Sequence, residues 1–293
     1  MNRTRPLAFA IIVLASPCDL RPQEPPMSHS RSSFLAARLE ASNVVPPSTS
    51  PGSGSGVFVF SAKGHQSALS YQLSYATLAS PEVRSITLNN FGAGKDGKVV
   101  HVICGEEAKK CPTGTDATLR GVWSSEDARL PLTELLWTEL ANRRIYIEIQ
   151  TAKGKEIRSQ LGANPFMVMA QEGLADLRGT GAAESATGTA AVRLITIRGK
   201  PELELLLTVA NSRQNPTKVA VLAKERTLGA FQLRHEEGVR PSRTIRMTVT
   251  VQDLKALSDQ TLNKAFATDE LTLIVFLDEG EQNTVRGQVR MVR

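Results

Sequence analysis

The sequence predicts an all-β protein made of two tandem antiparallel, Greek-key-like β-sandwich domains, each with one short helix before its closing strands. Apolar and polar residues alternate along much of the chain after Val57, which is typical of strands with one buried face. Clusters of Gly, Asn, Asp and Pro separate these runs and predict turns. The order of elements then recurs at an offset of roughly 130–140 residues, which is the size of a domain. The 293 residues therefore divide into two domains.

The N-terminal segment resembles a secretory signal peptide. Arg3 and Arg5 precede an apolar run from Leu7 to Ala15, and this run is far shorter than the roughly 20 residues of a membrane-spanning helix. We expect residues 1–15 to be the signal, cleaved after Ala15, and residues 16–33 to form a flexible tether. The alternative is an N-terminal tail with Met27 as the true start. A signal peptide predicts a secreted, extracellular or periplasmic protein.

The three cysteines divide into two cases. Cys18 follows a segment similar to a bacterial lipoprotein signal, so lipid attachment at Cys18 is an alternative, although Pro17 departs from that pattern. Cys104 and Cys111 flank the polar segment 105–110 and predict a disulfide in an oxidising compartment. The rival interpretation of this pair is a metal or redox site, which the spacing does not favour.

Alternation identifies the strands along the chain. The clearest runs lie at residues 69–75, 145–149, 203–209, 245–251 and 271–277. Two other segments have helical spacing. The first lies between Pro131 and Asn142, where the apolar face consists of Leu132, Leu135, Leu136 and Leu140. The second follows Asp253 and contains Leu254, Leu257 and Leu262.

Three pairs of segments carry the repeat. They are residues 34–39 with 173–178, residues 55–60 with 187–192, and residues 156–161 with 284–289. These pairs predict a first β domain at 34–161, a linker at 162–173 and a second β domain at 174–293. In the last pair, Arg158 and Gln160 recur as Arg286 and Gln288. We expect these four to be structural hydrogen-bonding residues near each final strand, with a shared binding role as the alternative.

Several motifs of the first half resemble the CHRD family, a module named after its repeats in chordin. Residues 39–47 read Leu-Glu-Ala-Ser-Asn-Val-Val-Pro-Pro and precede a Gly-rich step, and residues 94–100 read Gly-Lys-Asp-Gly-Lys-Val-Val. Residues 146–151 and 155–161 match the closing strands of the family pattern. The resemblance covers roughly residues 34–161 and is faint in 174–290. It implies an extracellular β-sandwich.

Two departures from the family pattern bear on chemistry. Typical members carry a His-x-His pair where this chain has Ser-Ile-Thr-Leu at 85–88, and often a further His where Gln150 stands. Any metal or acid–base role of those histidines therefore does not transfer to this chain. The histidines that it does have are dispersed, and we interpret His101 as a packed or edge residue of a strand.

Other candidate chemistry is weak. The stretch Gly-Ala-Gly-Lys-Asp-Gly-Lys at 92–98 is close to a phosphate-binding P-loop, but Val99 stands where Ser or Thr is needed, so we expect a hairpin turn. The sequence contains no Gly-x-Ser-x-Gly elbow for a nucleophilic serine. We therefore expect no catalytic residue, metal site or cofactor.

Charge and aromatic content restrict the partners. The net charge of +6 is modest, and 5% aromatics disfavour stacking on bases or sugars. The densest basic stretch is either a solvated strand face or a contact for an acidic partner, and consists of Arg234, Arg240, Arg243 and Arg246.

Together these features predict a secreted, non-catalytic binding module whose partner is an extracellular protein or polymer, not a nucleic acid. One alternative is a structural or lipid-anchored cell-envelope protein. A metal-dependent oxidoreductase is the third and less favoured hypothesis: His-x-His pairs on β-sandwiches also occur in copper/zinc superoxide dismutases, but the absence of that pair from this chain argues against it.

Overall fold

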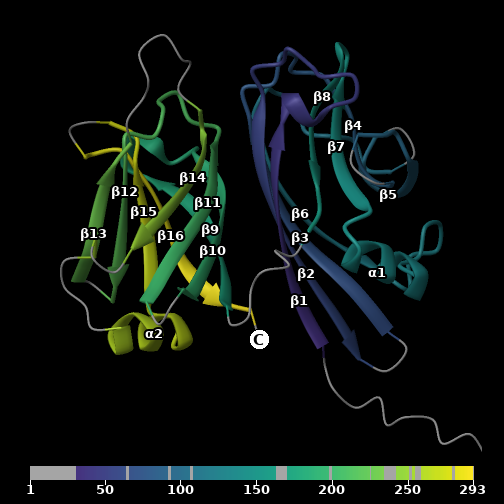
Figure 1. Ribbon diagram of the computed structural model, residues 1–293. Helices are drawn as coiled ribbons and strands as arrows, with labels where there is room; N and C mark the ends of the chain where they lie inside the picture. Colours follow the sequence, from purple (N-terminus) through teal and green to yellow (C-terminus); the bar gives the residue numbers. More distant parts are fainter. Residues whose placement is uncertain are drawn as a thin grey trace, which may run out of the picture.

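The chain forms two eight-stranded antiparallel sheets, one from each half of the sequence (Figure 1). The computed structural model describes residues 31–63, 66–91, 94–105, 108–162, 170–197, 200–224, 226–233, 242–250, 253–254, 259–278 and 281–292. The predicted signal peptide and Cys18 lie outside the described residues. The fold is an all-β sandwich, as the alternation predicts.

The first sheet has the strand order β5-β4-β7-β8-β1-β2-β3-β6. It curls around a core to which every strand contributes. The elements of this half are β1 (Arg31–Glu40), the 3-10 turn η1 (Ala41–Asn43), β2 (Ser53–Lys63), β3 (Gln66–Ala76), β4 (Val83–Asn90), β5 (Lys98–Cys104), β6 (Ala117–Ser124), α1 (Glu134–Ala141), β7 (Ile145–Thr151) and β8 (Gly154–Gln160).

The second sheet has the order β13-β12-β15-β16-β9-β10-β11-β14, which repeats the first with each strand number raised by eight. It encloses a core of its own. Its elements are β9 (Ala170–Thr180), η2 (Gly181–Ala183), β10 (Thr187–Ile197), β11 (Lys200–Ala210), β12 (Lys218–Ala223), β13 (Arg226–Gln232), β14 (Thr244–Thr250), α2 (Asp259–Ala267), β15 (Leu271–Phe276) and β16 (Thr284–Met291).

Both helices lie directly before the closing strands, as predicted. The second begins at Asp259, later in the chain than the segment after Asp253 that the sequence indicates. Thr133 caps the start of α1 by accepting a hydrogen bond from the N–H of Leu136 at 3.3 Å. In the second half, Asp253 instead accepts the N–H of Thr250 at 3.0 Å and so closes a turn. Leu254 packs in the core ahead of α2, and Leu257 lies outside the described residues.

The structure also corrects two predicted boundaries. β1 begins at Arg31, inside the predicted tether 16–33, and β9 begins at Ala170, inside the predicted linker 162–173. In both places the strand ladder continues beyond the alternating apolar residues, since backbone pairing does not require apolar side chains.

Strand register corrects two correspondences between the halves. Ser55 lies opposite Arg38, and Thr189 lies opposite Asp176, so Ser55 matches Thr189 and not Thr187 as in the pairing of 55–60 with 187–192. The other correction concerns β1 and β9. Ala37 lies opposite Gly56, Ala175 lies opposite Ala190, and both alanines pack in the core of their own sheet. Ala175 therefore matches Ala37, whereas the sequence pairing of 34–39 with 173–178 sets it against Ala36. A displacement of one residue turns a strand over. The sequence pattern does not reveal this displacement because β1 is apolar on both faces, with Leu35 in the core and Phe34 outside it.

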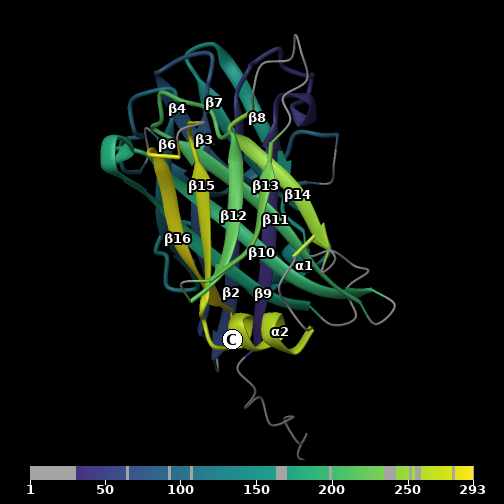
Figure 2. The same cartoon turned by 90° about the vertical axis from the view of Figure 1, so that its left-hand side faces the viewer.

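The two sheets pack against each other through β2, β3 and β6 of the first and β10, β11 and β14 of the second. The two halves lie side by side in Figure 1 and one behind the other in Figure 2. A small apolar cluster lies between them, centred on Phe34, Val57 and Ala191. Beside this cluster is a set of buried hydroxyl groups, in which Ser74 and Thr189 share a hydrogen bond of 2.7 Å. The interface is therefore partly apolar and partly a network of paired hydroxyls.

The contacts between the halves are reciprocal. Thr118 of the first half bonds to Thr187 of the second at 3.0 Å, and Thr244 of the second bonds to Ser53 of the first at 3.1 Å. Thr118 and Thr244 occupy matching positions in β6 and β14, opposite Ser74 and Thr208 respectively. The two halves thus pack as a homodimer with two-fold symmetry does, with the same surface used by each.

Among the described residues, no helix is long and apolar enough to cross a membrane.

Candidate functional site

A cleft of about 350 Å³ opens at one end of the interface between the two sheets. Both halves contribute polar groups to its wall, namely Arg38, Arg143 and Gln160 from the first half and Arg193, Glu204 and Arg246 from the second. The remaining lining is small or apolar and consists of Ala36, Gly162, Ala191, Leu205 and Leu206. We call this site the arginine cleft.

Strand pairing sets the positions of the central groups. Arg246 of β14 lies opposite Leu206 of β11, and Leu206 lies opposite Ala191 of β10. These three residues form one row across the sheet and point to the same face, since residues directly opposite each other in neighbouring strands share a face. The row ends in the exposed side chain of Arg246.

Carboxylates balance some of the cationic charge of the arginine cleft. Arg193 donates from Nε and Nη2 to the same oxygen of Glu172, at 3.0 and 2.9 Å. Burial raises the pKa of Glu172, and the neighbouring Arg193 opposes that rise. Arg38 forms an exposed ion pair with Glu40 at 2.8 Å. Arg193 is therefore fixed in place, while Arg38 is held only by a solvated contact, which contributes little to stability.

The guanidinium group of Arg246 makes neither a hydrogen bond nor an ion pair within the described part of the chain. A guanidinium group presents several N–H donors in one plane, a geometry that fits the oxygens of carboxylate, sulfate and phosphate groups. Among the described residues that line the cleft, Glu204 alone carries a carboxylate. The lining therefore favours anionic ligands.

The structure brings together two residues that the sequence singled out separately. Gln160 and Arg246 both line the cleft, although they lie in different halves of the chain. Arg243, from the same basic stretch as Arg246, instead forms an ion pair with Asp116 across the interface. Arg234 and Arg240 lie outside the described residues.

Gln160 and Gln288 have the same structural role in the two halves. Gln160 Nε2 donates to the carbonyl of Arg143, and Gln288 Nε2 donates to the carbonyl of Asp269. Arg143 and Asp269 both have left-handed backbone conformations, with φ of 57° and 56°. Each glutamine therefore secures the turn between the helix and the following strand.

Arg158 and Arg286 share a position but not an environment. Arg158 is 2% exposed and its guanidinium carbon lies 3.4 Å from the centre of the Tyr146 ring, whereas Arg286 is exposed. Arg158 also donates to the carbonyl of Lys95 at 2.5 Å and lies 3.5 Å from the carboxylate of Asp96. It therefore holds the turn at 94–97 against the outer face of β7 and β8.

β4 and β5 pair as antiparallel neighbours, so residues 94–97 of the stretch close to a P-loop lie between two strands, as predicted; Gly92 and Ala93 lie outside the described residues. Beneath the turn at 94–97 lies Glu148, which is 8% exposed. Burial raises the pKa of Glu148, while the positive charges of Lys155 and Arg158 oppose the rise.

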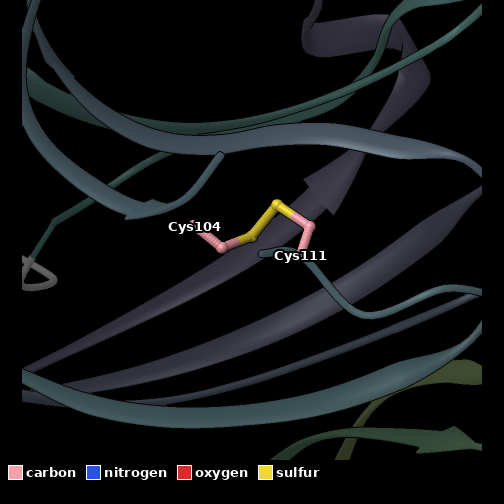
Figure 3. Close-up of a disulfide and its surroundings, with 2 residues drawn as sticks. All are labelled: Cys104 and Cys111. Atoms are coloured by element: carbon pink, nitrogen blue, oxygen red, sulfur yellow. A yellow bond between two sulfur atoms is a disulfide. The ribbon is translucent and has the colours of Figure 1, made fainter. Parts of the chain in front are cut away.

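Cys104 and Cys111 form the predicted disulfide, with Cα atoms 5.0 Å apart (Figure 3). Both cysteines are buried in the core of the first half, and Cys104 is the last residue of β5. The bond ties the segment after β5 to the body of the sheet.

His101 is packed in the structure, as predicted. Its ring stacks on Trp123 with ring centres 5.2 Å apart, and it is 6% exposed. Burial lowers the pKa of His101 to about 4; Lys109 adds to this effect, and Asp127, 3.7 Å away, opposes it. Within the described ranges, no three His, Cys, Asp or Glu residues lie close enough to hold a metal ion together.

Sequence reasoning missed Arg38, Arg143 and Arg193. A signal for Arg38 exists in the repeat, because the corrected register matches Arg38 with Asp176, a reversal of charge. The displaced sequence pairing sets Arg38 against Leu177 instead and conceals this reversal. Arg143 and Arg193 have no comparable signal, since only the packing of the two sheets brings them together.

Comparison with known proteins finds a family match in the first half. A family model described as the CHRD domain matches residues 35–161. No curated protein and no solved structure shows significant similarity to the chain.

Proposed function

We propose that the protein is a secreted, non-catalytic binding protein that recognises an acidic extracellular partner through the arginine cleft, on the premise that residues 35–161, which match the CHRD family model, form a CHRD domain. The observation that carries this proposal is the cleft itself: four arginines from both halves line one cavity, against a single carboxylate among the described lining residues. Such a lining suits an anionic ligand.

The disulfide supports an extracellular location. Disulfides such as Cys104–Cys111 persist in oxidising compartments and are rare where cellular thiols remain reduced. The predicted signal peptide at 1–15 points to the same compartment. The alternative of a lipid anchor at Cys18 concerns how the protein is retained and leaves the binding role unchanged.

We also propose that the second half is a diverged copy of the first. Its sheet repeats the strand order of the CHRD domain, and Gln288 repeats the contact made by Gln160. Its role in binding is to supply the opposite wall of the cleft. Because the interface contains paired buried hydroxyls, the two halves act as one unit rather than as two independent domains.

Affinity capture tests the proposal. The full chain is immobilised and exposed to native extracellular material, beside the variant Arg246→Glu. We expect an acidic partner to be enriched by the wild-type chain, lost with Arg246→Glu and weakened as salt is raised, because screening reduces attraction between exposed charges. Failure to enrich any partner across several salt concentrations would overturn the proposal.

Two further measurements address the alternatives. Metal analysis of the purified protein tests the oxidoreductase hypothesis, which predicts a stoichiometric metal. We expect no stoichiometric metal. Cell fractionation combined with mass analysis of the N-terminus distinguishes a free chain beginning after Ala15 from one acylated at Cys18.

A further inference from the structure

Two arginines occupy matching positions at opposite ends of the interface between the halves. Arg120 of β6 lies opposite Gln72 of β3, and Arg246 of β14 lies opposite Leu206 of β11. Because β6 and β14 have the same place in their sheets and contact the other half reciprocally, the surroundings of the two arginines can be compared position by position.

At the Arg120 end, a carboxylate neutralises the arginine. Arg120 forms an ion pair with Asp176 of the second half, and Gln72 Nε2 donates to the same carboxylate at 3.3 Å. Asp176 lies opposite Thr189 in β10. This end of the interface is thus closed by an acid that belongs to the protein.

At the Arg246 end, the matching acid is replaced by a base. Arg38 lies opposite Ser55 in β2, as Asp176 lies opposite Thr189 in β10. Arg38 and Arg246 both line the arginine cleft, where Leu206 stands in the place of Gln72. Two guanidinium groups therefore share a cavity at the site where the other end holds an arginine and a carboxylate.

We propose that the arginine cleft binds an oxyanion (a carboxylate, sulfate or phosphate group) between Arg38 and Arg246, where the carboxylate of Asp176 lies at the other end of the interface. The inference deepens the proposed function and rests on it for its biological meaning, because this group would be the part of the acidic partner that the cleft recognises. Arg38 has only the solvated contact with Glu40 as a counter-charge, so an oxyanion between Arg38 and Arg246 lowers the repulsion between the two guanidinium groups and accepts hydrogen bonds from both.

The other polar groups of the cleft limit what fits. Arg193 is occupied by Glu172, so it contributes a fixed positive field rather than free donors. Glu204 adds one negative charge to the wall. A single oxyanion group therefore suits the cleft better than a dense run of anions, which Glu204 would repel.

The ligand would also link the two halves. Arg38 belongs to β1 and Arg246 to β14, so one oxyanion between them bridges the interface. Binding should consequently raise the melting temperature of the whole chain, because a ligand that binds only the native state stabilises it.

The test uses the full chain and three salts. Sulfate, phosphate and acetate are titrated at constant ionic strength, balanced with chloride, while binding is measured by calorimetry and the melting temperature by thermal unfolding. We expect at least one of the three to bind and to raise the melting temperature by about 2 °C or more near saturation. The order among the three salts identifies the preferred oxyanion. Absence of binding by all three would overturn the inference.

A matched pair of variants locates the site. Arg246→Gln should weaken oxyanion binding by about tenfold or more, since it removes a charged donor pair, whereas Arg120→Gln should leave binding within about twofold of wild type. Equal losses in the two variants, or none in either, would contradict the assignment.

Arg38→Asp tests the comparison between the two ends directly. It places in the cleft the residue type found at the matching position 176, so Arg246 gains a partner within the protein. We expect oxyanion binding to be lost while the melting temperature is retained or rises. Retained binding in a folded Arg38→Asp chain would overturn the inference.

These outcomes separate the inference from the proposed function. Capture of an acidic partner without any binding of the simple oxyanions would support the proposed function and contradict the oxyanion site. Oxyanion binding that depends on Arg246, with no partner captured from native material, would support the site and contradict the function.

Discussion

Asp116 of the first half and Arg243 of the second form an ion pair across the interface between the two sheets. The same carboxylate accepts the backbone N–H of Thr77 at 2.9 Å and that of Asn211 at 3.2 Å. Thr77 and Asn211 are matching turn residues, and both have left-handed backbones with φ of 59° and 56°. One side chain thus connects equivalent turns of the two halves.

Removal of this carboxylate should weaken the joint between the halves. We expect Asp116→Ala to lower the free energy of unfolding by about 3 kcal/mol, because it leaves the mostly buried Arg243 without its counter-charge and two N–H groups without an acceptor. Urea unfolding measures the loss. Arg84→Ala, which removes an exposed ion pair with Glu82, is the control and should change stability by less than about 0.5 kcal/mol. Equal effects in the two variants would contradict the role assigned to Asp116.

Alternation of side chains predicts the fold because each strand has one face in a core. The alternating run at 69–75 lies within β3 and illustrates this, since Leu69, Leu73 and Tyr75 are all buried. The arginine cleft was less predictable, since Arg38, Arg193 and Arg246 lie on the outer faces of strands, where the sequence does not reveal which surface another sheet will cover. Arg246 was recognised as basic, but its contact with the first half depends on how two finished sheets pack.

The disulfide should stabilise the first half through loop closure. Cys104 and Cys111 close a short loop, so loop-closure entropy predicts that the disulfide stabilises the folded state by about 2–3 kcal/mol. We expect a reducing agent to lower the urea midpoint of the wild-type chain. The double variant Cys104→Ala with Cys111→Ala should start from lower stability and show no further change on reduction. An unchanged wild-type midpoint under reducing conditions would show that the bond contributes nothing to stability.

The stability of the protein should decrease as His101 is forced to take up a proton. The pKa of His101 is about 4 in the folded chain, against about 6.5 in an unfolded one, so between these values the unfolded state binds more protons. The contribution of neutral His101 to the free energy of unfolding is therefore complete above about pH 6.5 and is lost as the pH falls toward 4. We expect a loss of up to about 2 kcal/mol, reduced by partial contact with solvent.

His101→Phe isolates this effect, since phenylalanine retains a ring to stack on Trp123 but does not titrate. Unfolding free energies of the two chains are compared from pH 7 to pH 4. The difference between the chains should grow in favour of the variant as the pH falls. A constant difference across this range would show that His101 does not take part in acid destabilisation.

Arg158 and Arg286 should differ sharply on substitution, although they stand at matching positions of the two sheets. Arg158 is buried between the ring of Tyr146 and the turn at 94–97, and its Nη1 has no hydrogen-bond partner. Arg158→Ala removes the stacking contact and the hydrogen bond to Lys95, and leaves the buried carboxylate of Glu148 with less opposing charge. We expect a loss of about 3 kcal/mol, because breaking a buried ionic cluster is costly.

Arg286→Ala is the matched control, and because Arg286 is exposed, its loss should stay within about 0.5 kcal/mol. The second half has no cluster of this kind at the matching place, since Ile274 lies opposite Arg286 where Glu148 lies opposite Arg158. A further consequence is that the pKa of Glu148 should be higher in Arg158→Ala than in the wild-type chain, because the variant lacks a positive charge that lowers it. NMR titration of Glu148 in the folded variant measures this change. Similar stability losses in the two variants, or an unchanged pKa of Glu148, would show that Arg158 is not the residue that holds this turn and its buried acid together.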